Sequence, residues 1–315
     1  MSESSPIHER ICLAGARATS KCQQVRFNTV VMAASSDMTA LDAFLSERYR
    51  DHEACTGCPP SRAVAAWFEE LLGLLLPERS ERRYSRVEEL EGHWRELQAR
   101  LSALIVIVGR EPPDEVAHQF MAGLPDVHER LVQDVTAIEQ GDPAATSLSE
   151  VARTYPGVLA VAAYRVAHAL HLLDVPLLPR VLTAYAHGAT GIDIHPAARI
   201  GRHFCIDHGT GIVVGATAVI GERVKLYQGV TLGGLSVRKE DAAIKRHPTI
   251  EDDVVIYAGA TILGGDTVIG RGSVIGGNVW ITRSVPPGSR ISYRVNGGEG
   301  SDGMAAGAVV QGGPA

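Results

Sequence analysis

The sequence has few cysteines for its length, and their number is odd. Five occur among 315 residues, which is not the pattern of a domain held together by a disulfide framework. Cys55 and Cys58 form a CxxC motif, but no second CxxC or nearby histidine pair completes a set of zinc ligands. We therefore interpret this motif as an inert pair at the surface.

Long apolar runs and a large excess of charge are also lacking. No apolar run reaches the roughly 18 residues typical of a membrane span, and the run Leu101–Gly109 is expected to form a buried helix. The N-terminus carries acidic residues and lacks an apolar signal core. A net charge of −6 favours neither nucleic acid nor an anionic membrane as a partner. These absences predict a cytoplasmic protein with no nucleic-acid or membrane partner.

The N-terminal half has the spacing of helices. Hydrophobic residues make up 45% of the chain, enough for the cores of two domains. Residues 1–37 show no periodicity and are expected to be a poorly ordered extension. From residue 38 to residue 190, apolar residues recur three and four positions apart, as at Val64, Phe68 and Leu71. This spacing predicts an α-helical domain over 38–190.

A repeat of six residues begins at residue 191. Such a period predicts short strands that each send one aliphatic side chain into a narrow solenoid core, with three strands to a coil. We expect about four coils between residues 191 and 290. The predicted inward residues are Ile194, Ile200, Ile206, Ile212, Ile220, Leu226, Leu232, Ile250, Ile256, Ile262, Ile269, Ile275 and Ile281.

One interval keeps the phase of the repeat but not its composition. The interval from Leu232 to Ile250 is as long as one coil, and the inward positions within it would be Arg238 and Ile244. Burying Arg238 in a thin apolar prism would be very costly. Residues 233–249 are therefore expected to leave the solenoid as an exposed loop. The final residues, 291–315, are expected to be a Gly-rich flexible tail.

Four motifs are longer and far more specific than the repeat. They read DIHPAARIGRHFCIDHGTGIVVGATAVIGERV, QGVTLGG, KRHPTIEDDVVIYAGATILGG and SVPPGSR. With the region from Asp142 to Ser289, they resemble the serine O-acetyltransferases, a family of hexapeptide acyltransferases. The resemblance implies an α+β fold, in which an N-terminal α-helical domain precedes a left-handed parallel β-helix. It also implies transfer of acetyl from acetyl-CoA to the hydroxyl of L-serine, giving O-acetyl-L-serine for cysteine biosynthesis.

The chemistry of this reaction calls for a general base, because a serine hydroxyl is a poor nucleophile near neutral pH. Histidine suits that task, and a carboxylate on its far ring nitrogen would fix the tautomer. Asp193 and His208 are separated by slightly less than one coil of sequence, which places them in the same neighbourhood of the coils. The resemblance implies that these two residues form the catalytic dyad, with His208 as the base.

The resemblance also implies the contacts of the acceptor, L-serine. Asp142 and Asp207 would bind its amine, and Arg246 with His247 would hold its carboxylate, for which arginine has a bidentate fork. No metal is expected. L-Cysteine resembles the acceptor, so we expect it to compete for the same pocket as a feedback inhibitor.

Acetyl-CoA would lie along small residues of the coils. The resemblance assigns this track to Gly233, Gly234, Ala258 and Gly259, where pantetheine can approach the backbone. Relatives with this fold assemble as trimers with active sites between subunits, so a homotrimer or a hexamer is expected. Shorter members of the family end in an isoleucine that inserts into O-acetylserine sulfhydrylase. This chain ends GAVVQGGPA, so its sequence does not predict that complex.

Three alternative functions share parts of this pattern. Another hexapeptide acetyltransferase, acting on a sugar or amino-sugar hydroxyl, would use His208 but would not need Asp142, Asp207 and Arg246. A zinc β-helix of the carbonic anhydrase type would use His203 and His208, whose spacing of five suits two ligands. A non-catalytic β-helix scaffold would have no use for an Asp–His pair.

Overall fold

The computed structural model describes residues 39–235, 244–294 and 307–311. Residues 1–56 and 57–315 form two compact units. The predicted extension 1–37 lies outside the described residues, as do the middle of the predicted loop and most of the predicted tail. Within the part of the chain that is described, no helix is both long and apolar enough to cross a membrane.

The first unit contributes one described helix, over residues 39–54. Its apolar side chains Leu41, Phe44, Leu45 and Tyr49 are all exposed. Each cysteine of the CxxC motif is disulfide-bonded. All residues of the candidate site belong to the second unit.

The second unit begins with helices that surround a common apolar core. Proline at the start of α4, α6 and α7 suits the first helical turn, where a backbone N–H has no partner to lose. Helix α7 ends at Gly191, which adopts the left-handed conformation at φ 71°. The elements are α2 (Ser61–Leu75), the 3₁₀ turn η1 (Pro77–Arg79), α3 (Val87–Ile107), α4 (Pro113–Gly141), α5 (Leu148–Thr154), α6 (Pro156–Leu172) and α7 (Leu178–Thr190).

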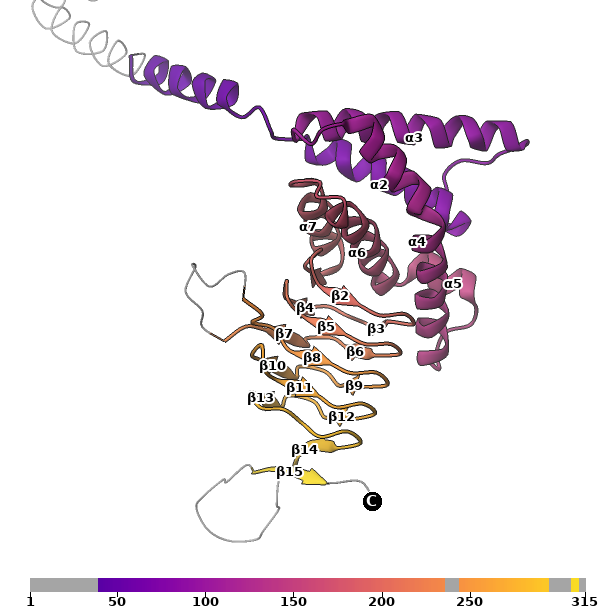
Figure 1. Cartoon of the computed structure of the whole chain (residues 1–315), viewed down its shortest axis with the longest axis vertical. Coiled ribbons are helices and arrows are strands. Elements are labelled where there is room, and N and C mark those ends of the chain that lie inside the picture. Colours follow the sequence, from indigo (N-terminus) through magenta and orange to yellow (C-terminus); the bar gives the residue numbers. More distant parts are fainter. Residues whose placement is uncertain (1–38, 236–243, 295–306, 312–315) are drawn as a thin grey trace, which may run out of the picture. The chain divides into compact units, whose positions relative to one another are not determined.

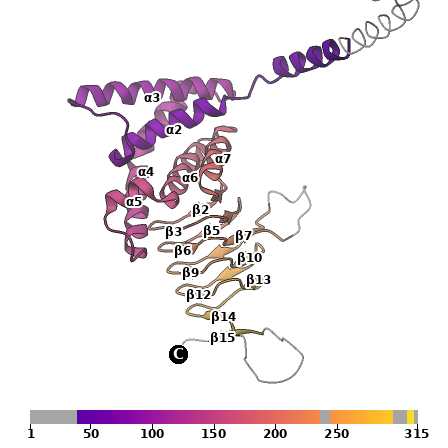
Figure 2. The same ribbon diagram turned by 180° about the vertical axis from the view of Figure 1, so that it is seen from behind.

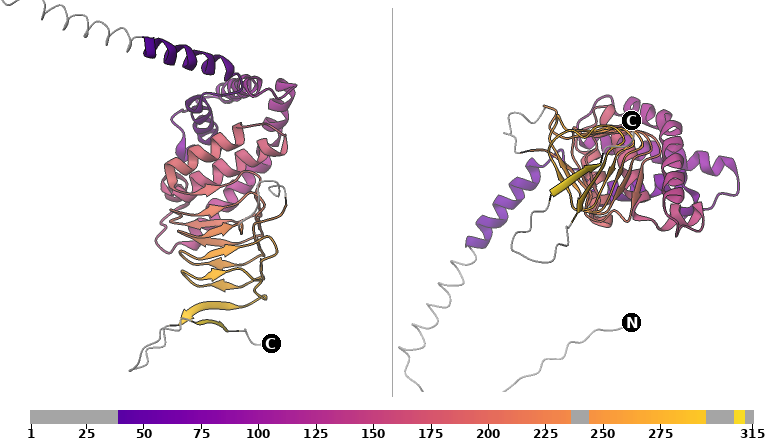
Figure 3. Two further views of the ribbon diagram at one scale, coloured as in Figure 1. Left: turned by 90° about the vertical axis from the view of Figure 1, so that its left-hand side faces the viewer. Right: turned by 90° about the horizontal axis from the view of Figure 1, so that it is seen from below.

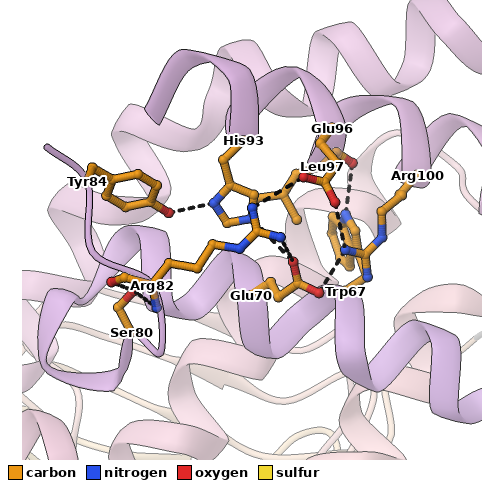
Figure 4. A network of polar contacts seen from close by, with 9 residues as sticks. All are labelled: Trp67, Glu70, Ser80, Arg82, Tyr84, His93, Glu96, Leu97 and Arg100. Atoms are coloured by element: carbon orange, nitrogen blue, oxygen red, sulfur yellow. Dashed lines mark hydrogen bonds and ion pairs between the residues drawn. The ribbon is translucent and has the colours of Figure 1, made fainter. Parts of the chain in front are cut away.

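A polar network joins α2 to α3 and the loop between them (Figure 4). Its centre is His93, which is 4% exposed. The Nδ1 atom of His93 lies 2.5 Å from the hydroxyl of Tyr84, and its Nε2 atom lies 3.3 Å from Glu70. Arg100 donates to the other oxygen of Glu70 at 2.8 Å. Both ring nitrogens of the buried histidine are thus satisfied, as burial of a polar side chain requires.

After α7 the chain winds into stacked coils, whose strands form three sheets (Figures 1 and 2). Sheet A contains β1 (Asp193–Ile194), β4 (Val213–Val214), β7 (Thr231–Gly233), β10 (Thr261–Leu263) and β13 (Trp280–Ile281). Sheet B contains β2 (Arg199–Ile200), β5 (Val219–Ile220), β8 (Thr249–Ile250) and β11 (Val268–Ile269). Sheet C contains β3 (Cys205–Asp207), β6 (Lys225–Tyr227), β9 (Val255–Ile256), β12 (Val274–Ile275), β14 (Arg290–Arg294) and β15 (Gly307–Gln311).

The strands pair in parallel, except that β15 runs antiparallel to β14. The predicted fold, an α-helical domain followed by a parallel β-helix, is confirmed. Sheet A has five strands, so the solenoid has about five coils where the sequence predicted about four. The additional coil arises because the chain continues past the last predicted inward residue, Ile281, with Val285 beside Ile269 and β14 beside β12.

The register corrects one detail of the predicted repeat. Val213 of β4 pairs with Asp193 on one side and with Thr231 on the other, and the first step along the sequence is longer than the second by two positions. The extra positions lie between β3 and β4, in the corner that contains His208. The list of predicted inward residues puts the two extra positions between Ile212 and Ile220. In the structure Val214 is the inward residue of β4, and Ile212 is buried in the corner before it. A corner that projects from the coil can take up extra residues without disturbing the strands.

The interior of the prism is a continuous column of aliphatic side chains. Its first coil is covered by α6, whose Ala160, Val161 and Tyr164 belong to the same apolar cluster (Figure 3). Gly157, at the start of α6, lies so close to β3 that a Cβ atom there would be 2.8 Å from the carbonyl oxygen of Ile206. The close packing of α6 therefore ties the helical region to the coil that carries the candidate site.

The chain leaves sheet A at the end of β7 and re-enters sheet B at β8. Residues 236–243, within the predicted excursion 233–249, lie outside the described residues. Of the two positions that an uninterrupted repeat would turn inward, Arg238 and Ile244, only Ile244 is described, and it is 61% exposed. Ile250, where the repeat resumes, is fully buried.

Candidate active site

His208 lies in the projecting corner directly after β3. Its backbone has a φ of 56°, a left-handed conformation that is uncommon for residues with a side chain. The side chain is 74% exposed, and its Nε2 atom lies 3.6 Å from Oδ1 of Asp207. Gly209 follows with a φ of 93°, and a Cβ atom there would lie 2.5 Å from the side chain of Ile192. The corner thus presents His208 to solvent because its neighbour packs tightly inward.

Asp193, the predicted partner of His208, begins β1 in the same coil. It pairs in register with Val213 of β4. The hydrogen bonds of the described residues include none between Asp193 and His208, and the carboxylate nearest to the imidazole in an ion-pair contact is that of Asp207. The dyad stays a prediction.

Asp207 closes β3, and its carboxylate meets a lysine of the next coil. Nζ of Lys225 lies 2.9 Å from Oδ2 of Asp207 and donates to the carbonyl oxygen of Gly141 at 2.6 Å. The side chains of Asp207 and Lys225 are only 11% and 15% exposed. Burial alone would lower the pKa of Lys225, but its contacts with Tyr227 and Asp207 outweigh burial and raise that pKa. This lysine is therefore charged at neutral pH.

Asp142 follows α4, directly after Gly141, whose carbonyl oxygen accepts from the same lysine. Its two carboxylate oxygens accept hydrogen bonds from the hydroxyl of Tyr155, at 2.6 Å, and from the amide of Ala144, at 2.8 Å. These two bonds, the first more strongly, lower the pKa of Asp142, and Lys225 and His208 act in the same direction. The bond to Asp142 raises the pKa of Tyr155 to about 12. Asp142 is thus ionised and near both His208 and Lys225.

Arg246 and His247 lie where the chain re-enters the coils, and Thr217 holds both. The hydroxyl of Thr217 accepts from the backbone amides of Arg246, at 2.9 Å, and His247, at 3.1 Å. Nδ1 of His247 accepts from the amide of Thr217 at 3.0 Å. Burial, with the positive charges of Arg246 and Lys245, lowers the pKa of His247 to about 4. The His247 ring is therefore neutral at pH 7, with its proton on Nε2.

The four residues expected along acetyl-CoA fall into two pairs. Gly233 and Gly234 follow the last buried residue of β7, whereas Ala258 and Gly259 form the corner before β10. Because β7 and β10 are parallel neighbours, the two pairs lie at opposite ends of these strands. Gly259 has a φ of 71°, and a Cβ atom there would lie 2.2 Å from Oδ1 of Asn278. The close approach at this corner therefore requires glycine.

The sequence did not single out Lys225, Tyr155 or Thr217, each of which holds a predicted site residue. The position of Lys225 could have been found from the sequence, because Lys225 follows Cys205 by one coil and therefore lies beside β3. The signals for Tyr155 and Thr217 were absent, since their partners depend on how distant segments meet. Among the described residues, no group of three His, Cys, Asp or Glu side chains is arranged to hold a metal ion.

Comparisons with known proteins place the chain in one family. No family model matches it. The "Serine acetyltransferase, plasmid" of Synechococcus elongatus is 56% identical over 183 residues, which are 56% of this chain and 57% of that relative. The match thus spans little more than half of the cyanobacterial relative. The serine acetyltransferase of Bacillus licheniformis is 47% identical over 161 residues, which are 51% of this chain and 72% of that relative. The chain belongs to the serine acetyltransferase family.

Solved structures of serine acetyltransferases also match this chain. The crystal structure of serine acetyltransferase isoform 3 from Entamoeba histolytica, in complex with cysteine, matches with a TM-score of 0.64 and 37% identity. That match covers 71% of this chain and 79% of the Entamoeba chain. The predicted family and its enzyme class, acyltransferase, are confirmed.

Proposed function

We propose that this chain transfers the acetyl group of acetyl-CoA to the hydroxyl of L-serine, with His208 as the general base. The observation that best supports the proposal is the gathering of His208, Asp207 and Asp142 around one end of the first coil. In a member of the serine acetyltransferase family, an exposed imidazole beside two carboxylates suits an acceptor that carries both a hydroxyl and an ammonium group.

In the proposed reaction, the imidazole of His208 removes the proton of the serine hydroxyl as its oxygen attacks the thioester carbonyl. The new C–O bond forms, and collapse of the tetrahedral intermediate breaks the C–S bond. The thiolate of CoA leaves and takes the proton from the imidazolium, which restores neutral His208. Asp193 would stabilise that imidazolium if the corner that holds His208 turns its ring toward β1.

The charges of the site suit the rest of the acceptor. The ionised carboxylates of Asp142 and Asp207 would attract the ammonium group of serine. The guanidinium of Arg246 would bind its carboxylate, to which it can offer two parallel hydrogen bonds. His247 is neutral, so it would contribute a single donor from Nε2 rather than a second positive charge.

The outer face of sheet A suits an extended substrate such as acetyl-CoA. Between the two pairs of small residues, the outward positions of β7 and β10 are Thr231 and Thr261, and both are half-buried. Such side chains leave room for a pantetheine arm against the strands. Acetyl-CoA bound along this face would extend between Gly259 and Gly233, beside the corner that carries His208.

We also propose that the protein assembles as a homotrimer or a hexamer, as its β-helical relatives are expected to do. Light scattering on the purified full chain would measure this directly, and a monomer would contradict it. L-Cysteine is proposed to compete with serine, which is consistent with the cysteine bound to the Entamoeba relative. The cytoplasmic location stays a prediction.

The experiment that tests the proposed function is a thiol-release assay with acetyl-CoA and a panel of acceptors. Serine should be acetylated far faster than homoserine, a galactoside or glucosamine. Release of CoA with a sugar and not with serine would favour the alternative hexapeptide acetyltransferase. Apparent KM for serine should rise with added L-cysteine, and a KM that stays constant would contradict competition for the amine site.

A further inference from the structure

Lys225 is a charged residue within the candidate site that the proposed reaction does not use. It lies in β6, and its side chain is 15% exposed. Its Nζ atom contacts the carboxylate of Asp207 at 2.9 Å, the carbonyl oxygen of Gly141 at 2.6 Å and the ring centroid of Tyr227 at 4.4 Å. These partners come from β3, α4 and β6. One ammonium group therefore joins the helical region to two coils at the site.

We propose that Lys225 is a positioning residue for recognition of the acceptor's amine. Its ammonium group holds Asp207 and the end of α4, which leads into Asp142, so that both carboxylates are directed at one substrate ammonium. The proposal rests on the proposed function, because it concerns the amine of serine. Lys225 acts through Asp207 and Asp142, and it makes no contact with the reacting atoms.

The charge balance of the pocket supports this role. Asp142 and Asp207 carry two negative charges, and Lys225 reduces their sum to one. A single substrate ammonium would then neutralise the pocket. Without Lys225, the nearly buried carboxylate of Asp207 would lack this partner before substrate arrives, and an unpaired buried charge is costly. That carboxylate would then turn toward solvent.

The end of α4 approaches β3 and β6 closely, and this is a second, independent observation that supports the role of Lys225. A Cβ atom on Gly141 would lie 3.0 Å from Sγ of Cys205 and 3.6 Å from Nζ of Lys225. The last residue of α4 is thus a glycine where the helix meets β3 and β6, and its carbonyl points at the lysine. Asp142 is the next residue. Its position therefore depends on the contact between Gly141 and Lys225.

Tyr227 and Tyr257 form a wall beneath the ammonium group. Their rings stack with centroids 4.9 Å apart and an interplanar angle of 9°. Lys225 lies over the face of Tyr227, where the ring quadrupole attracts a cation. This wall restricts the rotamers of Lys225, so that its ammonium group stays between Asp207 and Gly141 rather than extending into solvent.

The test compares three full-length variants, Lys225→Met, Lys225→Arg and Arg223→Met, by steady-state kinetics with serine and acetyl-CoA. Loss of a hydrogen bond between charged groups typically changes affinity about tenfold. We expect K225M to raise the KM for serine and the inhibition constant of L-cysteine each about tenfold, with the KM for acetyl-CoA unchanged. K225R keeps the charge and should restore most of the affinity for serine.

Arg223 provides the matched control. It lies two residues before Lys225, and it pairs with Asp253 at 2.6 Å on the outside of the coils. R223M removes an ion pair from the same part of the β-helix and should leave the KM for serine unchanged. Melting temperatures of all variants would separate a loss of folded protein from a change in affinity.

The difference between the two substrates gives a readout that a purely structural role would not move. K225M should raise the KM for serine while the KM for acetyl-CoA stays unchanged. An unchanged or lower KM for serine in K225M would overturn the proposal, since a lower value means that Lys225 competes with the substrate amine. Wild-type enzyme that releases no thiol with serine would instead refute the proposed function.

Discussion

Arg165 of α6 and Asp134 of α4 form a buried bidentate ion pair, with Nε to Oδ2 at 2.8 Å and Nη2 to Oδ1 at 3.1 Å. The guanidinium also donates to the carbonyl oxygens of Ile200 and Gly201, at 2.7 Å and 2.6 Å. Oδ1 of Asp134 accepts in addition from the amide of Phe204 at 2.8 Å. This pair therefore fastens two helices to the first coil, which carries the candidate site.

Arg165→Met should lower the free energy of unfolding by about 3–5 kcal/mol, because it leaves the carboxylate of Asp134 buried without its partner. Urea denaturation followed by circular dichroism would measure the loss. The double variant Arg165→Met with Asp134→Leu should be less destabilised than the single one, since no charge is then buried alone. A single variant with nearly wild-type stability would contradict this role for the pair.

His208→Ala should lower kcat about a hundredfold to ten-thousandfold, the usual contribution of a general base. Its melting temperature should stay close to that of the wild type, because the side chain is 74% exposed. Turnover of serine in the thiol-release assay is the measurement.

His203→Ala is the matched control for this variant. His203 lies in the same coil, and its backbone φ is 56°, the same as that of His208. The control should retain most of the activity. Near wild-type turnover in His208→Ala would rule out its role as the base, and an equal loss in both variants would indicate a general effect on the coil.

His247 should make the folded protein less stable in mild acid. Its pKa is lowered to about 4 in the folded state, chiefly by burial, whereas an unfolded histidine titrates near its ordinary value of 6.5. Between these values the unfolded chain binds more protons, so stability falls as the pH decreases from 6.5 toward 4. The contribution of this one residue reaches at most about 3 kcal/mol.

The measurement is the melting temperature as a function of pH for the wild type and His247→Gln. The variant should be less stable at pH 7, where it loses the packing of the imidazole ring, but its stability should fall less steeply in mild acid. His195, whose pKa burial also lowers to about 4, and His168, whose pKa burial lowers as well, contribute to the slope that remains. Identical slopes in the two proteins would contradict the prediction.

Gly259→Ala should destabilise the protein by about 1–3 kcal/mol, because the residue has a φ of 71° and no room for a Cβ atom beside Asn278. Gly123→Ala is the control, since a Cβ atom at this exposed position of α4 would meet nothing within 4 Å. That change should stabilise the helix by about 1 kcal/mol. Thermal denaturation of both variants would test the pair, and the same sign for the two changes would be evidence against it.

The β-helix was predictable because its information is local. One aliphatic residue every six positions specifies where each short strand points inward, and Ile200, Ile206 and Ile220 are all buried as expected. The phase at Ile212 shows the limit of this reasoning, because Ile212 is buried in the apolar cluster as expected but does not occupy the strand position that matches Ile194. A corner with extra residues has no periodicity of its own, so only the pairing of β4 with β1 revealed that Val214 takes the inward position.

The candidate site was predictable where a motif carried it and not where distant segments meet. His208 and Asp207 belong to a motif that resembles one family, and the comparisons confirm that family. The contact between Lys225 and Gly141 joins residues 84 positions apart in the chain. It exists because α6 packs against the first coil and brings the end of α4 beside β3.

The six-residue period and the long motifs were enough to specify a β-helix and the family to which the chain belongs. The inward residue of each strand follows from the spacing of residues that are close together in the sequence. The charge environment of the site was decided by the tertiary structure alone. Whether Asp207 faces solvent or an ammonium group depends on the step between coils and on the packing of a helix, and neither is recorded in the local order of residues.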